Sequence, residues 1–285
     1  MTATLGEVLG AARARLVAAG IPNDEAGLDV DLYARRILGW DRARVLTSRT
    51  EPAPPALEPT FSAWVTRRSH REPSAYVIGE REFYGRDFHV SPAVLVPRPE
   101  TEHIVEAALP LLAVQPTARV ADIGTGCGNI AVTLACEAPA CTVVATDVSD
   151  VALVVAAQNA VRHGVARRVT CVQTSYLDGI DEVFDLIAAN PPYVREQDRE
   201  ALSPSVQREP AVALFGGADG MRDLEGVLLT TRARLKPGGW LLMEFGFGQE
   251  DAVRAAMDRH PWLRFDRVIE DLQGLPRTVI AQRLP

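Results

Sequence analysis

Lysine is almost absent from this chain of 285 residues, because Lys236 is the only one and the other cations are arginines. We interpret this bias as a property of the genome rather than of a mechanism. The formal net charge is −7, so no overall basic field would attract a nucleic acid. Direct binding of nucleic acid is therefore not expected.

Cysteine is also scarce, with four residues at positions 127, 136, 141 and 171. None forms a C-x-x-C pair and no histidine lies at ligand spacing from two of them, so we expect no metal. Cys136 and Cys171 have apolar neighbours in the sequence, where a reduced cysteine acts as a small hydrophobe. A reducing compartment fits this usage.

Long apolar runs are missing as well. No stretch approaches the ~20 apolar residues of a membrane-spanning helix, and the start of the chain lacks the charged segment and apolar run of a signal peptide. We therefore expect a cytoplasmic protein without membrane association, and a monomer.

Residues 4–72 have the periodicity of helices. Apolar residues from Leu5 to Val17 recur at helical spacing, and Gly20 and Pro22 end that helix. Asn23 or Asp24 can cap a second helix, and a third is predicted near 58–71. The apolar positions of the second helix are Leu28, Leu32, Ile37 and Leu38. We predict an N-terminal helical domain over residues 1–74.

Residues 75–96 change character. The segments Tyr76–Gly79 and Glu82–Val90 predict two short strands that turn near Gly85. We predict a β-hairpin linker over residues 75–96. A stiff, proline-containing segment then enters a helix predicted at about 100–113.

Residues 97–285 are predicted to form an α/β domain. Strands are expected at 119–123, 142–146, 169–172, 184–189, 240–244, 263–269 and 277–283, and helices at 128–137, 150–163, 220–235 and 249–259. Apolar strands that alternate with amphipathic helices are typical of a parallel sheet covered on both faces.

A glycine loop follows the first of these strands, in the segment Gly124-Thr125-Gly126-Cys127-Gly128. Glycines let the backbone turn sharply and approach a ligand closely, and ligands of open α/β sheets bind at the carboxyl ends of strands. The dinucleotide fingerprint G-x-G-x-x-G needs glycine at position 129, where this chain has Asn129. The spacing G-x-G-x-G is that of methyltransferases that bind the adenosine and methionine parts of S-adenosylmethionine.

Asp147 ends the next strand, nineteen residues after Gly128. A carboxylate there can accept hydrogen bonds from a ribose diol, although the same position suits NAD. The alternative role is a helix cap, for which Ser149 or Asp150 already serves.

The tetrad Asn190-Pro191-Pro192-Tyr193 ends a buried strand at the same sheet edge. Two prolines fix φ and remove two donors, which leaves the carbonyls of Asn190 and Pro191 and the Asn190 side chain as acceptors for an NH2 group. Tyr193 can stack on a planar group. Such a site orients a poorly nucleophilic planar nitrogen and stabilises the charge that develops on it during methylation.

At this point the chain resembles the peptide chain release factor glutamine N5-methyltransferases over nearly its whole length. Beyond the helical domain, the glycine loop and the tetrad, the resemblance includes Phe83-Tyr84-Gly85 with Phe88, Val96 to Glu102, Arg208-Glu209-Pro210 with Ala213 and Leu214, and Leu242 to Gly246. It implies a class I methyltransferase fold with a Rossmann-like sheet of seven strands. It also implies that the helical domain recognises the protein substrate.

The resemblance implies a substrate and a set of contacts. The substrate is the glutamine of the Gly-Gly-Gln motif in class 1 release factors, and S-adenosylhomocysteine is the by-product. The cofactor contacts residues 124–128, Asp147, Tyr176 and Asn190, and the glutamine amide is held by residues 190–193. Family members often have an acidic residue and then Trp where this chain has Ser175 and Tyr176.

Several roles stay open on the sequence. Arg98 could contact the cofactor carboxylate, the partner or a surface carboxylate; Glu100 and Glu102 favour the start of a helix; Glu244 has no assigned role. The tetrad also occurs in adenine-N6 and guanine-N2 methyltransferases, so a nucleic-acid amino methyltransferase is an alternative. That alternative expects a basic face or a target-recognition insertion, and a non-catalytic adaptor expects a broken tetrad or glycine loop.

Overall fold

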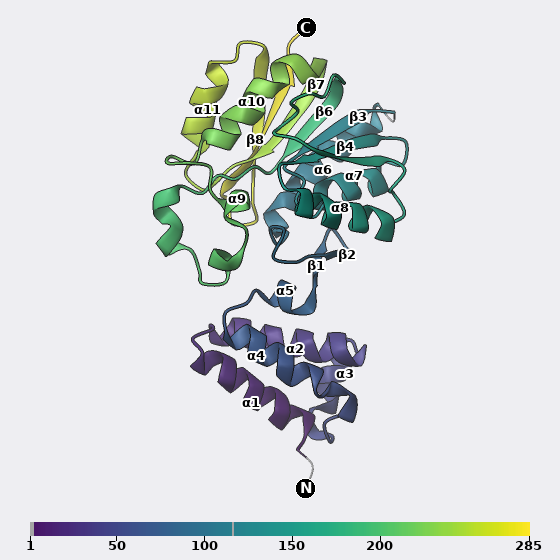
Figure 1. The fold of residues 1–285 in the computed structure, drawn as a ribbon, viewed down its shortest axis with the longest axis vertical. Helices are drawn as coiled ribbons and strands as arrows, with labels where there is room; N and C mark the ends of the chain where they lie inside the picture. Colours follow the sequence, from purple (N-terminus) through teal and green to yellow (C-terminus); the bar gives the residue numbers. More distant parts are fainter. Residues whose placement is uncertain (1–2, 116) are drawn as a thin grey trace. The chain divides into compact units, whose positions relative to one another are not determined.

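The computed structural model describes residues 3–115 and 117–285, and the chain divides into two compact units (Figure 1). The first unit comprises Met1–Gly79 and Pro204–Arg208, and the second comprises Glu80–Ser203 and Glu209–Pro285. The short segment 204–208 therefore belongs to the helical unit, although it lies late in the sequence.

The helical unit contains α1 (Leu5–Ala18), α2 (Asn23–Leu38), α3 (Arg42–Thr47), α4 (Thr60–Ser69) and α5 (Ser74–Ile78). Thr4 begins α1 with a capping box, in which its side chain and that of Glu7 each accept a hydrogen bond from the other's backbone NH. The residue that precedes α2 is Pro22, and it makes no side-chain cap. The expected cap at Asn23 or Asp24 is therefore wrong, because both residues already lie in the helix.

The buried face of α2 also differs from the expected one. Leu28 is 63% exposed, whereas Asp29, Val30 and Tyr33 are buried. Nε of Arg68, itself buried in α4, donates to Oδ2 of Asp29 at 2.6 Å. The helix thus turns a polar side chain inward to pair a buried charge, and apolar periodicity alone does not indicate that choice.

A two-stranded antiparallel hairpin opens the second unit, with β1 (Glu80–Phe83) and β2 (Arg86–His89). Its turn is made by Tyr84 and Gly85, both at positive φ, as a two-residue hairpin turn requires. The turn near Gly85 is confirmed, but the strand expected over Tyr76–Gly79 is wrong at residues 76–78. These residues lie in α5, which Pro73 precedes and the left-handed Gly79 ends.

The second unit is built on a seven-stranded sheet in the order β5-β4-β3-β6-β7-β9-β8. Its strands are β3 (Arg119–Ile123), β4 (Thr142–Asp147), β5 (Val169–Gln173), β6 (Phe184–Ala189), β7 (Leu235–Glu244), β8 (Leu263–Glu270) and β9 (Pro276–Arg283). Neighbours from β5 to β7 are parallel, whereas β9 runs antiparallel to β7 and β8. The expected parallel sheet is thus mixed, because the short connection 271–275 permits only an antiparallel pair.

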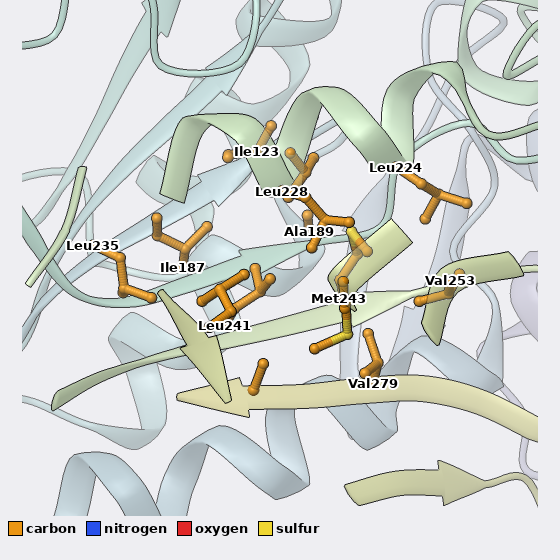
Figure 2. Close-up of a cluster of buried hydrophobic side chains, with 14 of the residues drawn as sticks. Ile123, Ile187, Ala189, Leu224, Leu228, Leu235, Leu241, Met243, Val253 and Val279 are labelled. Atoms are coloured by element: carbon orange, nitrogen blue, oxygen red, sulfur yellow. The ribbon is translucent and has the colours of Figure 1, made fainter. Parts of the chain in front are cut away.

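Helices cover both faces of this sheet. Side chains of β3, β6 and β7, among them Ile123, Ile187 and Leu241, pack against α10 (Arg222–Arg234) and α11 (Glu250–Asp258), as Figure 2 shows. The side chain of Asp122 points to the opposite face of the sheet from that of Ile123, because side chains alternate along a strand. Its Oδ2 accepts a hydrogen bond from the backbone NH of Ala131 in α7 (Asn129–Glu137). The opposite face therefore belongs to α7, which lies with α6 (Glu102–Ala113) and α8 (Asp150–Arg162) in Figure 1.

The amino and carboxyl ends of the strands carry different groups. At the amino end of β7, Nζ of Lys236 pairs with Oδ1 of Asp185 at 2.8 Å. At the carboxyl ends lie the glycine loop and the tetrad, which directly follow β3 and β6, and Asp147, which is the last residue of β4. Within the described residues, no helix has the length and apolar character to cross a membrane.

Candidate active site

A cavity of about 230 Å³ lies at the carboxyl ends of the strands. Seven residues expected at the site line it: Gly124, Gly126, Asp147, Tyr176, Asn190, Pro191 and Pro192. The remaining expected residues, Thr125, Cys127, Gly128 and Tyr193, do not belong to the cavity wall. The structure therefore brings most of the expected site residues together around one cavity. It also distinguishes the residues that line this cavity from those that do not.

The three glycines of the loop differ in function. Each has a positive φ, between 55° and 81°. A Cβ at Gly124 or Gly126 would meet open space, whereas one at Gly128 would lie 3.1 Å from Cβ of Ala156 in α8. The first two glycines thus give a ligand access to the backbone, and the third lets α7 and α8 approach closely.

The residues between these glycines support the loop from behind. Thr125 is buried and donates through Oγ1 to Oδ2 of Asp122 at 2.6 Å. Cys127 is also buried, and burial raises the pKa of its thiol to about 12. Asn159, fully buried in α8, donates through Nδ2 to the carbonyl of Cys127 at 2.8 Å. Neither Thr125 nor Cys127 can therefore offer its side chain to a ligand in the cavity.

Asp147 faces the cavity while it holds the loop. Oδ2 accepts from the backbone NH of Gly126, and Oδ1 accepts from that of Ser149, both at 2.9 Å. Ser149 itself caps α8, since its hydroxyl accepts from Ala152 NH. Each carboxylate oxygen of Asp147 keeps acceptor capacity for a diol, and the helix does not need this residue as its cap.

Tyr176 forms another part of the wall in the left-handed conformation, with φ 49°. Its ring packs against Gly226 of α10, where a Cβ would lie 2.1 Å from Cζ. Its hydroxyl donates to Oδ1 of Asp223 at 3.0 Å. Asp223 and Arg222 also line the cavity. Neither residue could be assigned to the site from the sequence, because helix periodicity does not indicate that the start of α10 reaches the cavity.

The tetrad is enclosed by close backbone contacts. A Cβ at Gly216 would lie 2.4 Å from the carbonyl oxygen of Pro192, and one at Gly220 would lie 2.3 Å from that of Tyr193. Nε2 of Gln249 donates to the Tyr193 carbonyl at 3.0 Å. The chain after β6 thus has little room to shift, and a glycine at each contact is what allows this packing.

Behind the tetrad lies a buried carboxylate that sequence reasoning left unassigned. Glu244, at the end of β7, is 2% exposed. Oε2 accepts from the hydroxyl of Thr101 at 2.7 Å, and Oε1 accepts from the hydroxyl of Tyr193 at 3.1 Å. Nδ2 of Asn190 donates to Oγ1 of Thr101 at 2.9 Å. Both ends of the tetrad are therefore connected to one carboxylate.

Two side chains of the proline-containing segment before α6, and that of the first residue of α6, make fixed contacts. Thr101 belongs to the bridge just described. Arg98 pairs through Nη2 with Oε1 of the buried Glu209 at 2.5 Å, and Oε2 of Glu209 accepts from Val96 NH. Oε1 of Glu102 accepts from the backbone NH of Tyr84 in the hairpin turn. Of the roles left open for Arg98, the ion pair is the one in the structure.

Two family models match the chain, one in the helical unit and one in the catalytic unit. A family model described as the PrmC N-terminal domain matches residues 7–79, and one described as the methyltransferase small domain matches residues 105–210. The catalytic domain of hMettl16, solved with a MAT2A 3'UTR hairpin, has a TM-score of 0.58 at 16% identity over 79% of this chain and 82% of that one. This likeness concerns the fold.

The sheet order and the cavity at its carboxyl edge define a class I methyltransferase fold, as expected from the sequence. A release factor glutamine methyltransferase of Cereibacter sphaeroides is 41% identical over 280 residues and covers 98% of both chains. One of Koribacter versatilis is 40% identical over 283 residues, covering 98% of this chain and 99% of the relative. The chain belongs to the release factor glutamine methyltransferases.

Proposed function

We propose that this enzyme transfers a methyl group from S-adenosylmethionine to the side-chain amide nitrogen of the glutamine in the Gly-Gly-Gln motif of class 1 release factors. The observation that carries the proposal is the position of Asn190, Pro191 and Pro192 in the wall of the cavity that Gly124, Gly126 and Asp147 also line. The acceptors for an NH2 group and the residues that can bind a nucleoside thus line the same cavity.

The cavity fits the cofactor by its chemistry. Gly124 and Gly126 leave backbone open to a ligand, Asp147 offers acceptors to a ribose diol, and Tyr176 offers an aromatic face to the adenine ring. We assign cofactor contacts to residues 124–128, Asp147, Tyr176 and Asn190, with Thr125, Cys127 and Gly128 acting through the loop backbone. S-adenosylmethionine supplies an electrophilic methyl group, and no metal is needed.

The tetrad residues have the task of orienting the glutamine amide. Oδ1 of Asn190 and the carbonyls of Asn190 and Pro191 are the acceptors for its two hydrogens. Accepting them stabilises the positive charge that develops on nitrogen and places its lone pair for in-line attack. Pro192 and Tyr193 hold this conformation, and the extra proton leaves to water after transfer.

The domain roles follow the same proposal. Residues 1–74 recognise the release factor, residues 75–96 form the linker that contains the hairpin β1–β2, and residues 97–285 carry out catalysis. The partner is a protein rather than a nucleic acid, since relatives that match nearly the whole chain carry the release factor name and the net charge is −7. We also infer a monomer that acts in the cytoplasm, where translation occurs, without membrane contact.

The decisive experiment offers two substrates to the same enzyme. The purified protein is incubated with labelled S-adenosylmethionine and either a class 1 release factor or DNA, and mass spectrometry locates the label. We expect label on the glutamine of the Gly-Gly-Gln motif and none on DNA. Asn190→Ala should abolish transfer while it spares the fold. Label on a base amine, or a wild-type rate in Asn190→Ala, would refute the proposal.

A further inference from the structure

The side chain of Asn190 has two ends of opposite hydrogen-bonding character, and only one of them can help a substrate NH2 group. Oδ1 is an acceptor and Nδ2 is a donor. An amide that rotates by half a turn would present donors to the incoming glutamine nitrogen and would repel its hydrogens. The reaction therefore needs a device that sets the orientation of this amide.

The contacts behind Asn190 determine that orientation. An ionised carboxylate only accepts hydrogen bonds, so the hydroxyl of Thr101 must direct its single proton to Oε2 of Glu244, 2.7 Å away. Oγ1 of Thr101 is then left with lone pairs alone. The atom of Asn190 that lies 2.9 Å from it must be the donor Nδ2, and Oδ1 is the end left for the substrate.

The second oxygen of the same carboxylate restrains the other end of the tetrad. Oε1 of Glu244 accepts from the hydroxyl of Tyr193 at 3.1 Å. Thr101 is 1% exposed and Glu244 2% exposed, so water does not compete for these bonds. Three segments meet here: the turn before α6, the end of β7 and the loop after β6.

We propose that Thr101 and Glu244 are positioning residues. They hold Asn190 with Oδ1 toward the substrate glutamine, and they fix the position of Tyr193 relative to Asn190. This inference rests on the proposed function, because it concerns the same amide. Neither residue touches the reacting atoms. Their effect is on the fraction of enzyme whose Asn190 is oriented for transfer.

The proposal has a consequence for pH. Burial, with a smaller contribution from Glu100, raises the pKa of Glu244 to about 7 against the lowering effect of the Thr101 and Tyr193 hydroxyls and of Arg277. When Glu244 is protonated, its OH can donate to Thr101, whose own proton then turns to Asn190 and favours the rotated amide. The transfer rate should therefore rise as pH increases through about 7, the range in which Glu244 ionises.

The first test compares Thr101→Val with Thr101→Ser in the full-length enzyme. Valine has the shape of threonine without the hydroxyl, whereas serine keeps the hydroxyl. At saturating cofactor and release factor, we expect Thr101→Val to slow single-turnover transfer by about 10- to 100-fold, the range known for loss of the hydrogen-bond partners that orient metal-binding side chains. Thr101→Ser should restore most of the lost rate, and in Thr101→Val cofactor affinity measured by calorimetry should fall far less than the rate.

A matched control removes a different buried hydroxyl. Thr133 in α7 is fully buried, and its Oγ1 has no hydrogen-bond partner among the described residues. Thr133→Val should transfer at the wild-type rate. A readout independent of turnover is the side-chain NH2 signal of Asn190 in a ¹⁵N spectrum, assigned by its loss in Asn190→Ala. We expect Thr101→Val, but not Thr133→Val, to shift it.

Glu244→Gln provides a second test through its pH profile. Glutamine puts a donor where the carboxylate accepted, so one of the two hydroxyls loses its acceptor. The variant should be slow and should lack the rise in rate through pH 7 seen in the wild type.

The possible failures are distinguishable. If the wild type methylates no release factor glutamine, the proposed function fails before any variant is compared. If the wild type is active and Thr101→Val equals Thr101→Ser, the positioning role is refuted. An equal loss of cofactor affinity and rate in Thr101→Val would refute it too, because that result means a purely structural role.

Discussion

The hydroxyl of Tyr176 donates to Oδ1 of Asp223 at 3.0 Å, and this bond joins the loop after β5 to the first turn of α10. Burial, with the nearby Asp223 carboxylate, raises the pKa of Tyr176 to about 12, so the tyrosine stays protonated and remains a donor. The ring of Tyr176 is thereby fixed in the cavity wall.

This arrangement separates the contribution of the ring from that of the hydroxyl. Tyr176→Ala should weaken S-adenosylmethionine binding by about 1–3 kcal/mol, the usual cost of losing an aromatic surface under a base. Tyr176→Phe keeps the ring and should stay close to wild type. Calorimetric titration with the cofactor measures both, and equal losses in the two variants would assign the effect to the hydroxyl instead.

Asp147 should contribute to cofactor affinity through its two carboxylate oxygens. Asp147→Ala removes the acceptors for the ribose diol and should weaken cofactor binding by about 1–3 kcal/mol, the range for lost hydrogen bonds to a charged group. The variant also loses the bonds to Gly126 and Ser149. Ser149→Ala, which removes the cap of α8, is the matched control for loop disturbance, and unchanged affinity in Asp147→Ala would exclude ribose contact.

Asp122 should make stability depend on pH. Burial raises its pKa from 3.8 to about 7, and its Oδ1 is a buried acceptor without a partner among the described residues. A carboxyl group whose pKa is raised by folding stabilises the fold fully below its unfolded pKa, and this contribution is lost as pH rises toward about 7. Asp122→Asn should not lose stability in this way, because asparagine does not ionise.

The measurement is the free energy of urea unfolding of Asp122→Asn minus that of the wild type. We expect this difference to become more favourable to the variant as pH rises from about 4 to about 7, the interval between the unfolded and folded pKa values. A difference that stays constant across this range would show that Asp122 has an ordinary pKa in the folded protein.

The buried ion pair of Arg68 and Asp29 should be costly to break on one side. Arg68→Met leaves Asp29, 6% exposed, without the guanidinium that donates to it at 2.6 Å. We expect a loss of about 3–5 kcal/mol in unfolding free energy, as for other uncompensated buried charges. The double variant with Asp29→Leu should recover much of it, and if it recovered nothing the pair would not be the cause.

Much of the catalytic unit could be predicted because its signals are local. The strands β3, β4 and β6 are short, largely apolar runs, and helices follow β3 and β4 directly, so the chain order placed the glycine loop, Asp147 and Asn190 at one edge. The bridge from Asn190 through Thr101 to Glu244 could not be predicted in this way. It joins residues that are 89 and 143 positions apart, and their contact depends on how α6 and β7 pack.

The errors in the helical unit have a similar origin. The spacing of Leu28 predicts a core position, but Leu28 is exposed and its neighbour Asp29 is buried instead, because Asp29 accepts a hydrogen bond from Arg68 of another helix. The residues at 76–78 have the composition of a strand, yet Pro73 and Gly79 bound them as a helix. In both places a partner or a backbone constraint outside the pattern overrides local preference.

Lys236 is the one side-chain amine in this sequence and therefore a defined position for chemical attachment. Its ammonium group is partly exposed beside Asp185, and it lies eight residues before Glu244 on β7, a distance of roughly 25 Å along an extended strand. An acylating dye or surface linker can react with no other side-chain amine in this sequence. A molecule tethered through this side chain would have its attachment point at the opposite ends of the strands from the catalytic cavity, which suits single-molecule measurement of release factor docking.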